Sequence, residues 1–267
     1  MNQEGKSFKR KSWIAAIMGM IMPGMGQIYN GEILKGMSLF VIFIVLVATG
    51  FRLSVYLPDR FLIVGITLTL AIVLMVYVFS IVEAYRKPYK QDGEYILKPY
   101  NRWYFYIAVW MLGSVLITGF VYNYTRDNII HVYKIATKSM EPAVLRGDRV
   151  LVDKTAYRRM PPKRGDIIIF VYPDDRSKVY IKRIAGLPDD VIKLEGGREV
   201  VVPHGAAYVL GDNKQNSEDS SKFGFIPLKD IVGKARQVWY SYGVDGMRWS
   251  RIGHTFGRLP QAEYQGK

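Results

Sequence analysis

Hydrophobic and polar positions divide the chain into two parts, with the boundary near residue 125. Most long uncharged runs lie before it, whereas afterwards charges are frequent and Gly and Pro separate short apolar runs. Residues 36–57, 61–82 and 103–125 are each close to the ~20 residues that a helix needs to cross ~30 Å of hydrocarbon. The only charge in the first of these, Arg52, lies near one end, where it can reach the headgroups. The pattern predicts three membrane-spanning helices.

Another apolar segment, residues 12–33, is interrupted by a Pro-Gly-Met-Gly turn at 23–26. It could span the membrane, re-enter it, or act as a removable signal peptide. The N-terminus and residues 86–102 are both rich in Lys and Arg, which predicts that both are cytoplasmic. An even number of crossings then separates them, so we expect residues 12–29 to be re-entrant or interfacial. The last span would run outward.

Beyond residue 127 the pattern is typical of β-structure. Short apolar runs alternate with turns such as Arg-Gly-Asp and Pro-Asp-Asp. The predicted strands are 149–152, 167–171, 179–184, 191–194, 208–210 and 237–242. We therefore expect a membrane module over residues 1–100, an anchor over 101–126, a β-rich, partly barrel-like domain over 127–252 and a loosely ordered tail over 253–267.

Charge and cysteine content narrow the function. The 37 Lys and Arg against 23 Asp and Glu give a net charge of +14, which favours either nucleic acid or anionic lipid as a partner. Many basic residues flank the apolar runs, and no nucleic-acid-binding motif is recognisable, so we expect membrane lipids and no nucleic acid. The chain has no cysteine, which excludes a thiol nucleophile, disulfides and Cys-based zinc sites.

A serine and a lysine in the β-rich part are candidates for chemistry. Ser139 follows the last predicted span, and serine needs a base within hydrogen-bonding reach to act as a nucleophile. In the strand predicted at 179–184, Tyr180, Lys182 and Ile184 share one face, where loss of water would lower the lysine pKa from ~10.4. The residues alone also permit a solvent-facing lysine and an ordinary loop at Ser139.

Several blocks of sequence, taken together and in this order, resemble type I signal peptidases, the membrane-bound Ser/Lys peptidases. The blocks are residues 139–142 with 145–148, 164–170, 180–190, and 211–220 with 224–227 and 233–235. The fold implied is a multi-span α-helical membrane region followed by a mainly-β, partly barrel-like catalytic domain.

The resemblance implies a role for each matching residue. Ser139 is the expected nucleophile and Lys182 the general base. Thr137 is expected to form the oxyanion hole, its hydroxyl acting together with the backbone N–H of Ser139. The supporting residues implied are Ser217, which orients the lysine, Asp219, which supports its block, and the turn residues Asp212 and Asn213. No metal or cofactor is implied.

The function implied is a serine endopeptidase that cleaves N-terminal signal peptides from exported preproteins. It would lie in the bacterial inner (cytoplasmic) membrane as a multi-pass protein, with its catalytic domain on the periplasmic or extracytoplasmic side. The alternatives are a specialised maturation peptidase for pilin or conjugation proteins, a non-catalytic membrane scaffold of the same fold, and a self-cleaving repressor of the related Ser/Lys fold.

The sequence departs from the family pattern at a few positions. Ser221 stands where many members have Arg; Lys222 could substitute for it, although a lysine cannot make the bidentate hydrogen bonds of an arginine. Asp189 replaces a Gly, which predicts modest strain if the turn needs a positive φ. Lys214-Gln215 replaces the more usual Arg-Asp. Outside the resemblance, residues 23–31 are similar to the Pro-Gly-x-Gly-Gln-x-Tyr-x-Gly motif of small helical-hairpin membrane modules, which predicts a tight packing turn.

Overall fold

The computed structural model describes residues 7–90, 95–96, 99–194, 197 and 199–257. Contacts divide the chain into two compact units. The first comprises residues up to 54 and 64–125, and the second comprises 55–63 and the residues from 126 onward. The second unit thus includes a short segment from the helical part of the sequence. Each unit is described by itself.

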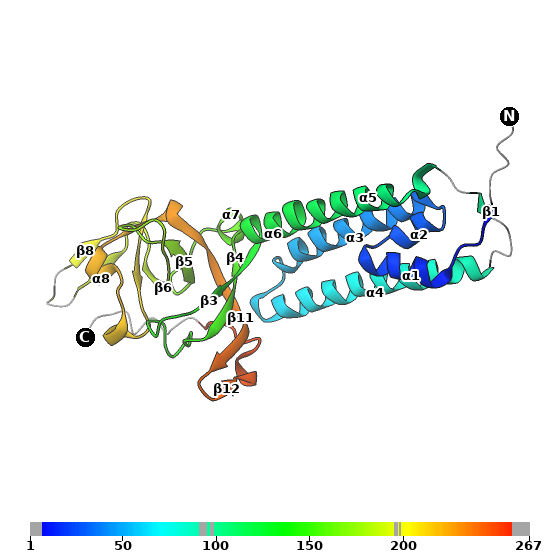
Figure 1. The fold of residues 1–267 in the computed structure, drawn as a ribbon. Helices are drawn as coiled ribbons and strands as arrows, with labels where there is room; N and C mark the ends of the chain where they lie inside the picture. The colour runs from blue at the N-terminus through cyan, green and yellow to red at the C-terminus, as the bar shows by residue number, and fades with distance from the viewer. Residues whose placement is uncertain (1–6, 91–94, 97–98, 195–196, 198, 258–267) are drawn as a thin grey trace. The chain divides into compact units, whose positions relative to one another are not determined.

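Helices make up most of the first unit (Figure 1). They are α1 (Ser12–Ile21), α2 (Met25–Tyr29), α3 (Ile33–Ser54), α4 (Leu62–Lys90), α5 (Trp103–Val115), a π-helical stretch (Leu116–Tyr122) and α6 (Asn123–Asn128). A two-residue β1 (Ser7–Phe8) pairs with β2 (Tyr95–Ile96). Among the described residues, three continuous helices have the length and apolarity to cross a membrane: Ile33–Ser54, Asp59–Pro88 and Trp103–Asn128. The three predicted spans are confirmed as helices of this kind, with shifted bounds.

The predicted turn after α1 is a packing element. With ten residues, α1 is about 15 Å long, too short to cross the hydrocarbon core alone. Gln27 is fully buried and donates to the backbone oxygen of Ser80 at 2.7 Å and to Glu83 at 2.8 Å. Asn30 donates to the backbone oxygen of Ala84 at 2.8 Å. These bonds join the turn to α4, which agrees with the packing interpretation, and the re-entrant topology stays a prediction.

Antiparallel strands form the second unit. One sheet has the order β10-β9-β6-β5-β11-β4-β3, with β12 paired to β11, and a small sheet joins β7 to β8. The bounds are β3 (Ile130–Lys134), β4 (Asp148–Asp153), β5 (Ile167–Val171), β6 (Val179–Gly186), β7 (Val191–Lys193), β8 (Glu199–Val201), β9 (Ala206–Leu210), β10 (Ile226–Pro227), β11 (Ile231–Gly243) and β12 (Gly246–Met247). Each predicted strand is observed, and β3, β8, β10 and β12 were not predicted.

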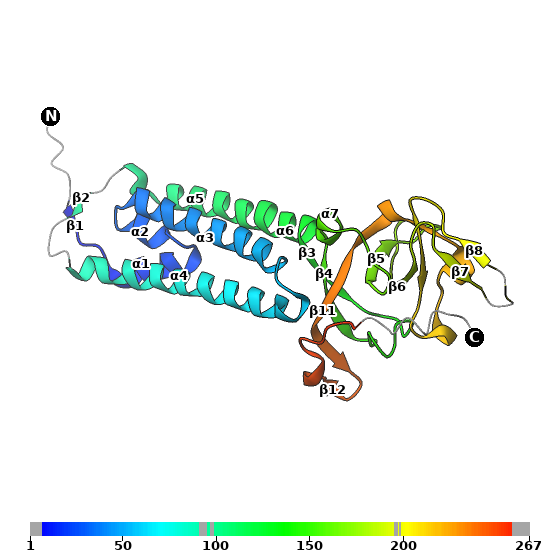
Figure 2. The same ribbon diagram turned by 180° about the vertical axis from the view of Figure 1, so that it is seen from behind.

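Strand β11 contributes to the curvature of the sheet. Its 13 residues pair first with β5 and then with β4, and the register shifts between Ala235 and Gln237 and again between Val238 and Tyr240. Such irregularities bend and twist a strand. The bend of this ribbon is visible from both sides (Figures 1 and 2). The sheet is therefore a curled half-barrel, as expected.

Short helices lie between or after the longer elements. They are η1 (Asp59–Phe61), η2 (Pro99–Asn101), α7 (Ala156–Arg159), η4 (Lys214–Asn216), α8 (Ser220–Phe223), η5 (Leu228–Asp230) and η6 (Trp249–Arg251).

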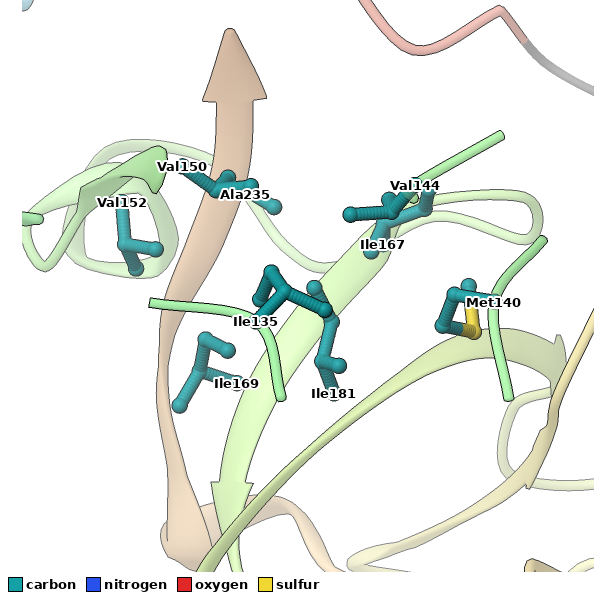
Figure 3. Packing of buried hydrophobic residues seen from close by; sticks show 9 residues of the cluster. All are labelled: Ile135, Met140, Val144, Val150, Val152, Ile167, Ile169, Ile181 and Ala235. Carbon is teal, nitrogen blue, oxygen red and sulfur yellow. The ribbon is translucent and has the colours of Figure 1, made fainter. Parts of the chain in front are cut away.

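Aliphatic side chains from several strands pack together against this sheet (Figure 3). Ile167 and Ile169 of β5 and Ile181 of β6 pack there with Val144 and with Met140, which is fully buried. Burial of large aliphatic side chains, at about 25 cal/mol per Å², is the main favourable contribution to such a fold. Met140 thereby fixes the chain one residue beyond Ser139.

The predicted tail begins too early. The N–H of Gly253 donates to the backbone oxygen of Val238 at 2.9 Å, and the N–H of Val238 donates to His254 at 2.9 Å. Phe256 packs against the core cluster. Backbone pairing with β11 and this apolar contact include residues 253–257 in the domain. The remainder of the predicted tail, 258–267, lies outside the described residues.

Candidate active site

Ser139 and Lys182 meet in a buried contact. Lys182 Nζ donates a hydrogen bond to Ser139 Oγ at 2.9 Å and another to the backbone oxygen of Ile181 at 3.1 Å. Each of the two residues is only 4% exposed. The sequence separates them by 43 positions, and the fold brings the nucleophile candidate and its base candidate within hydrogen-bonding distance.

Strand alternation places the lysine. Lys182 lies in β6 opposite Ile168 of β5, and its neighbour Ile181 points to the other side, into the core. The Tyr180 ring, on the same face as the lysine, has its centroid 5.5 Å from Nζ. Ile184, the next residue on that face, is fully buried. The predicted apolar surroundings of the amine are confirmed.

A tight turn places the serine. The N–H of Glu141 donates to the backbone oxygen of Lys138 at 3.1 Å, and the N–H of Val144 donates to Met140 at 2.8 Å. The peptide bond before Pro142 is cis. Since Met140 is anchored in the core, Ser139 is held at the entrance of the turn with its side chain toward β6.

Burial changes the protonation of the lysine. Loss of water lowers the pKa of Lys182 from 10.5 to about 8, although the carboxylates of Asp219, Glu218 and Asp212 oppose the shift. An amine with this pKa is partly neutral near neutral pH, and only the neutral amine can accept a proton.

The other predicted oxyanion donor lies beside the nucleophile. Thr137 Oγ1 is 3.3 Å from Ser139 Oγ. The Thr137 side chain is exposed, so it borders the site on the solvent side. A hydroxyl at this position can reach an oxygen of a substrate bonded to Ser139.

Asp212 and Asn213 do more than build a turn. The backbone N–H of Asn213 donates to the backbone oxygen of Ser139 at 3.0 Å, and its side-chain amide donates to Lys138 at 3.2 Å. Asp212 accepts two hydrogen bonds from Arg183, at 2.8 and 2.7 Å. Arg183 is 1% exposed and follows Lys182 directly. These hydrogen bonds thus join the turn that contains Ser139, strand β6 and the loop after β9.

Arg183 was not predicted as a site residue. Its position next to Lys182 was visible in the sequence, but alternation places it on the opposite face of β6. Only the fold reveals that Asp212 is its partner.

Ser217 is buried near the serine turn, separated from it by Gly211. A Cβ at Gly211 would lie 2.2 Å from Ser217 Oγ and 2.6 Å from the backbone oxygen of Ser139. Ser217 is 4% exposed, and its hydroxyl is one of the groups that lower the pKa of the neighbouring Asp219 carboxyl. No hydrogen bond between Ser217 and Lys182 is found among the described residues. The predicted orienting contact with Lys182 is therefore not made here, and that role stays a prediction.

Asp219 is satisfied by its own helix end and not by a cation. Its carboxylate accepts from the N–H of Gly211 at 3.0 Å and from the N–H and Oγ of Ser221 at 3.2 and 2.8 Å. Burial alone would raise the pKa of Asp219, but these hydrogen bonds outweigh it and keep the pKa below the usual value. Ser221 thus donates two of the hydrogen bonds to Asp219. Among the described residues Lys222 forms no ion pair, and its part in this block stays a prediction.

Comparison with known proteins covers the region of this site. Residues 107–201 and 193–240 match the family described as "Signal peptidase, peptidase S26". A probable signal peptidase I-1 from Synechocystis sp. is 31% identical, covering 45% of this chain and 74% of the relative. A signal peptidase I from Bacillus caldolyticus is 31% identical, covering 50% and 87%. One from Leptolyngbya laminosa is 34% identical, covering 38% and 64%.

Proposed function

The chain belongs to the signal peptidase family, peptidase S26, which makes it a serine endopeptidase, and we propose that Ser139 and Lys182 carry out its acyl transfer. The observation that carries this proposal is the 2.9 Å contact between Lys182 Nζ and Ser139 Oγ. Both groups are buried, and burial lowers the lysine pKa to about 8.

The reaction begins with proton transfer. Neutral Lys182 takes the proton from Ser139 Oγ while the oxygen attacks the carbonyl carbon of the scissile bond. The negative oxygen of the tetrahedral intermediate is stabilised by the N–H of Ser139 and the hydroxyl of Thr137. One donor of this kind contributes about 3 kcal/mol to transition-state stabilisation.

Breakdown of the intermediate needs the same lysine as an acid. Protonated Lys182 gives its proton to the leaving amine as the C–N bond breaks, and an ester joins the substrate acyl group to Ser139. Lys182, neutral again, removes a proton from water as the water attacks the ester. The acid leaves, and the proton returns to Ser139 Oγ.

Supporting residues fix the geometry of this exchange. Asn213 holds the peptide of Ser139 through two hydrogen bonds. Arg183 and Asp212 join the strand that carries Lys182 to the loop that carries Asn213. We assign these residues to positioning, because acyl transfer is sensitive to misplacement of about 1 Å.

The protein is a membrane protein with relatives in bacteria. We place it in the inner membrane with the peptidase on the outer side, where exported preproteins present their signal peptides. Basic residues at the N-terminus and around residues 86–102 support that orientation. A reporter fused after residue 95 should be cytoplasmic and one after residue 250 exocytoplasmic, and the reverse pattern would contradict the placement.

Substitution of each reacting group tests the mechanism. Ser139→Ala and Lys182→Met should each lower preprotein processing by roughly 10³-fold or more while the protein remains inserted. Ser177→Ala and Lys178→Met are matched controls, since both lie on the exposed turn between β5 and β6. Near-normal processing by the Ser139 variant would refute the nucleophile assignment.

The substrate range needs a separate experiment. Depletion of the protein, followed by sequencing of the N-termini of accumulated secreted proteins, should reveal many uncleaved signal peptides with small residues before the cleavage site. Accumulation of a pilin or a conjugation protein alone would instead indicate a specialised peptidase.

A further inference from the structure

Residues 55–63, the α3–α4 loop, join two apolar helices of the first unit but belong to the second unit. Val55 is 2% exposed and Leu62 is fully buried, which is unusual for a connection between two spans. The loop lies outside the residues that match the peptidase family. The residues that bind it, described next, all lie inside that match.

Arg236 of β11 holds the loop through its backbone and through one carboxylate. Its guanidinium donates to the backbone oxygen of Val55 at 2.8 Å and to that of Leu57 at 2.5 Å, and it forms an ion pair with Asp59. Arg236 is only 6% exposed. A buried guanidinium is tolerated only where its charge and its N–H groups are satisfied, and here the loop provides most of the partners.

A second arginine binds the same loop. Arg159 of α7 donates to the backbone oxygen of Val55 at 2.7 Å, and its guanidinium lies 4.7 Å from the centroid of the Tyr56 ring. Asp153, fully buried at the end of β4, forms ion pairs with both Arg159 and Arg236. Two arginines therefore face two carboxylates, and the second carboxylate is Asp59 from the loop.

The first turn of α4 is also hydrogen-bonded to β11. The N–H of Ile63 donates to Gln237 Oε1 at 3.1 Å, and Gln237 is 2% exposed. The first N–H groups of a helix have no partner within the helix, so this side chain acts as an external cap. The other end of the Gln237 amide donates to the backbone oxygen of Gly253 at 2.7 Å, which fixes its orientation.

We propose that the α3–α4 loop is a docking segment and that Asp153, Arg159, Arg236 and Gln237 form its receptor site on the peptidase sheet. The proposal rests on two observations. The two arginines are balanced by the carboxylates of Asp153 and Asp59, and both arginines donate hydrogen bonds to the backbone oxygen of Val55. The loop, which the peptidase match does not include, thereby completes a buried ionic site within the second unit. The chain passes between the units at residues 54–55, 63–64 and 125–126. This role is independent of the proposed catalytic residues.

Cross-linking in the full-length protein tests the docking directly. The chain has no native cysteine, so Tyr56→Cys combined with Arg159→Cys gives a unique thiol pair. A short bifunctional thiol reagent should join this pair in native membranes, as detected by mass spectrometry. Tyr56→Cys combined with Arg176→Cys is the control pair, because Arg176 pairs with Asp230 instead. Equal cross-linking of both pairs would overturn the proposal.

Charge reversal in the loop adds the specific test. Asp59→Arg should abolish most of the cross-link of the first pair, whereas Asp245→Arg, the same change on the exposed β11–β12 turn, should leave it intact. Unchanged cross-linking with Asp59→Arg would refute the role of the ion pair.

Hydrogen exchange provides a readout that leaves both arginines intact. The Ile63 amide should be protected in the native chain and should exchange about tenfold faster or more in Asp59→Ala, while Asp245→Ala matches the native rate. An unprotected Ile63 amide in the native chain would contradict docking. None of these measurements uses substrate cleavage, so their failure is distinct from failure of the proposed function.

Discussion

The protonation of Lys182 predicts the pH dependence of the peptidase. Burial lowers the lysine pKa from 10.5 to about 8. In the proposed mechanism the neutral amine accepts the Ser139 proton, so activity should rise with pH and level off above the lysine pKa. Below that pKa the rate should change by about tenfold per pH unit.

The shift is large enough to decide whether the enzyme works at neutral pH. With a pKa of about 8, about one lysine in ten is neutral at pH 7, compared with about one in 3,000 at the ordinary value of 10.5. The fraction of neutral lysine at pH 7 is therefore about 300-fold higher, which is equivalent to about 3 kcal/mol. Desolvation of the amine contributes this difference, because each nearby carboxylate acts in the opposite direction.

One of those carboxylates can be removed with little structural change. Glu218 is exposed, and it accepts its only described hydrogen bond from the Tyr180 hydroxyl, at 3.3 Å. Its negative charge raises the pKa of Lys182, so Glu218→Gln should lower that pKa and shift the rising limb of activity toward lower pH. Glu199→Gln, an equivalent change on exposed β8, is the control and should not move the limb.

The assay is kcat/KM for cleavage of a preprotein in detergent micelles, because its pH profile reports groups of the free enzyme. Measurements should extend from pH 5.5 to 10 and be repeated at high salt, which should reduce the effect of an exposed charge such as Glu218. A profile without inflection below pH 9, or a shift to higher pH in Glu218→Gln, would refute the desolvated general base.

Three further substitutions test the surroundings of the site. Gly211→Ala should lower kcat strongly, because the added Cβ would lie 2.2 Å from Ser217 Oγ and 2.6 Å from the backbone oxygen of Ser139. A normal kcat would contradict that packing. Met140→Ala should lower the free energy of unfolding by about 2–5 kcal/mol in chemical denaturation, because it empties a fully buried position; no loss would contradict its place in the core. Asp189→Gly should raise the free energy of unfolding by up to about 1 kcal/mol, because Asp189 has a φ of +69°, which glycine adopts without strain. A lower free energy of unfolding would show that the Asp189 side chain is needed.

Local patterns were sufficient for the elements. Uncharged runs of membrane-spanning length predicted the three long helices, and alternation with turn residues predicted β4, β5, β6, β9 and β11 of the main sheet but not its edge strands β3 and β10. Alternation also placed Lys182 on an apolar face, because side-chain direction along a strand depends only on position. The resemblance to signal peptidases then singled out Ser139, which spacing alone would have left in an ordinary loop.

Partners distant in sequence were beyond such patterns. The Arg183–Asp212 pair and the hydrogen bonds from Asn213 to the turn that contains Ser139 depend on which loops meet at the sheet. The end of the domain was likewise misplaced, since residues 253–257 are ordered by pairing with β11 and not by their own composition.

The sequence by itself determined which residues are the candidates for the chemistry and which segments suit a membrane, because residue type and periodicity are local properties. Tertiary structure decided that the amine and the hydroxyl meet in a desolvated place, since the pKa of Lys182 depends on what surrounds it. It also decided that a loop between two apolar helices belongs to the peptidase unit, because only folding brings Asp59 to Arg236.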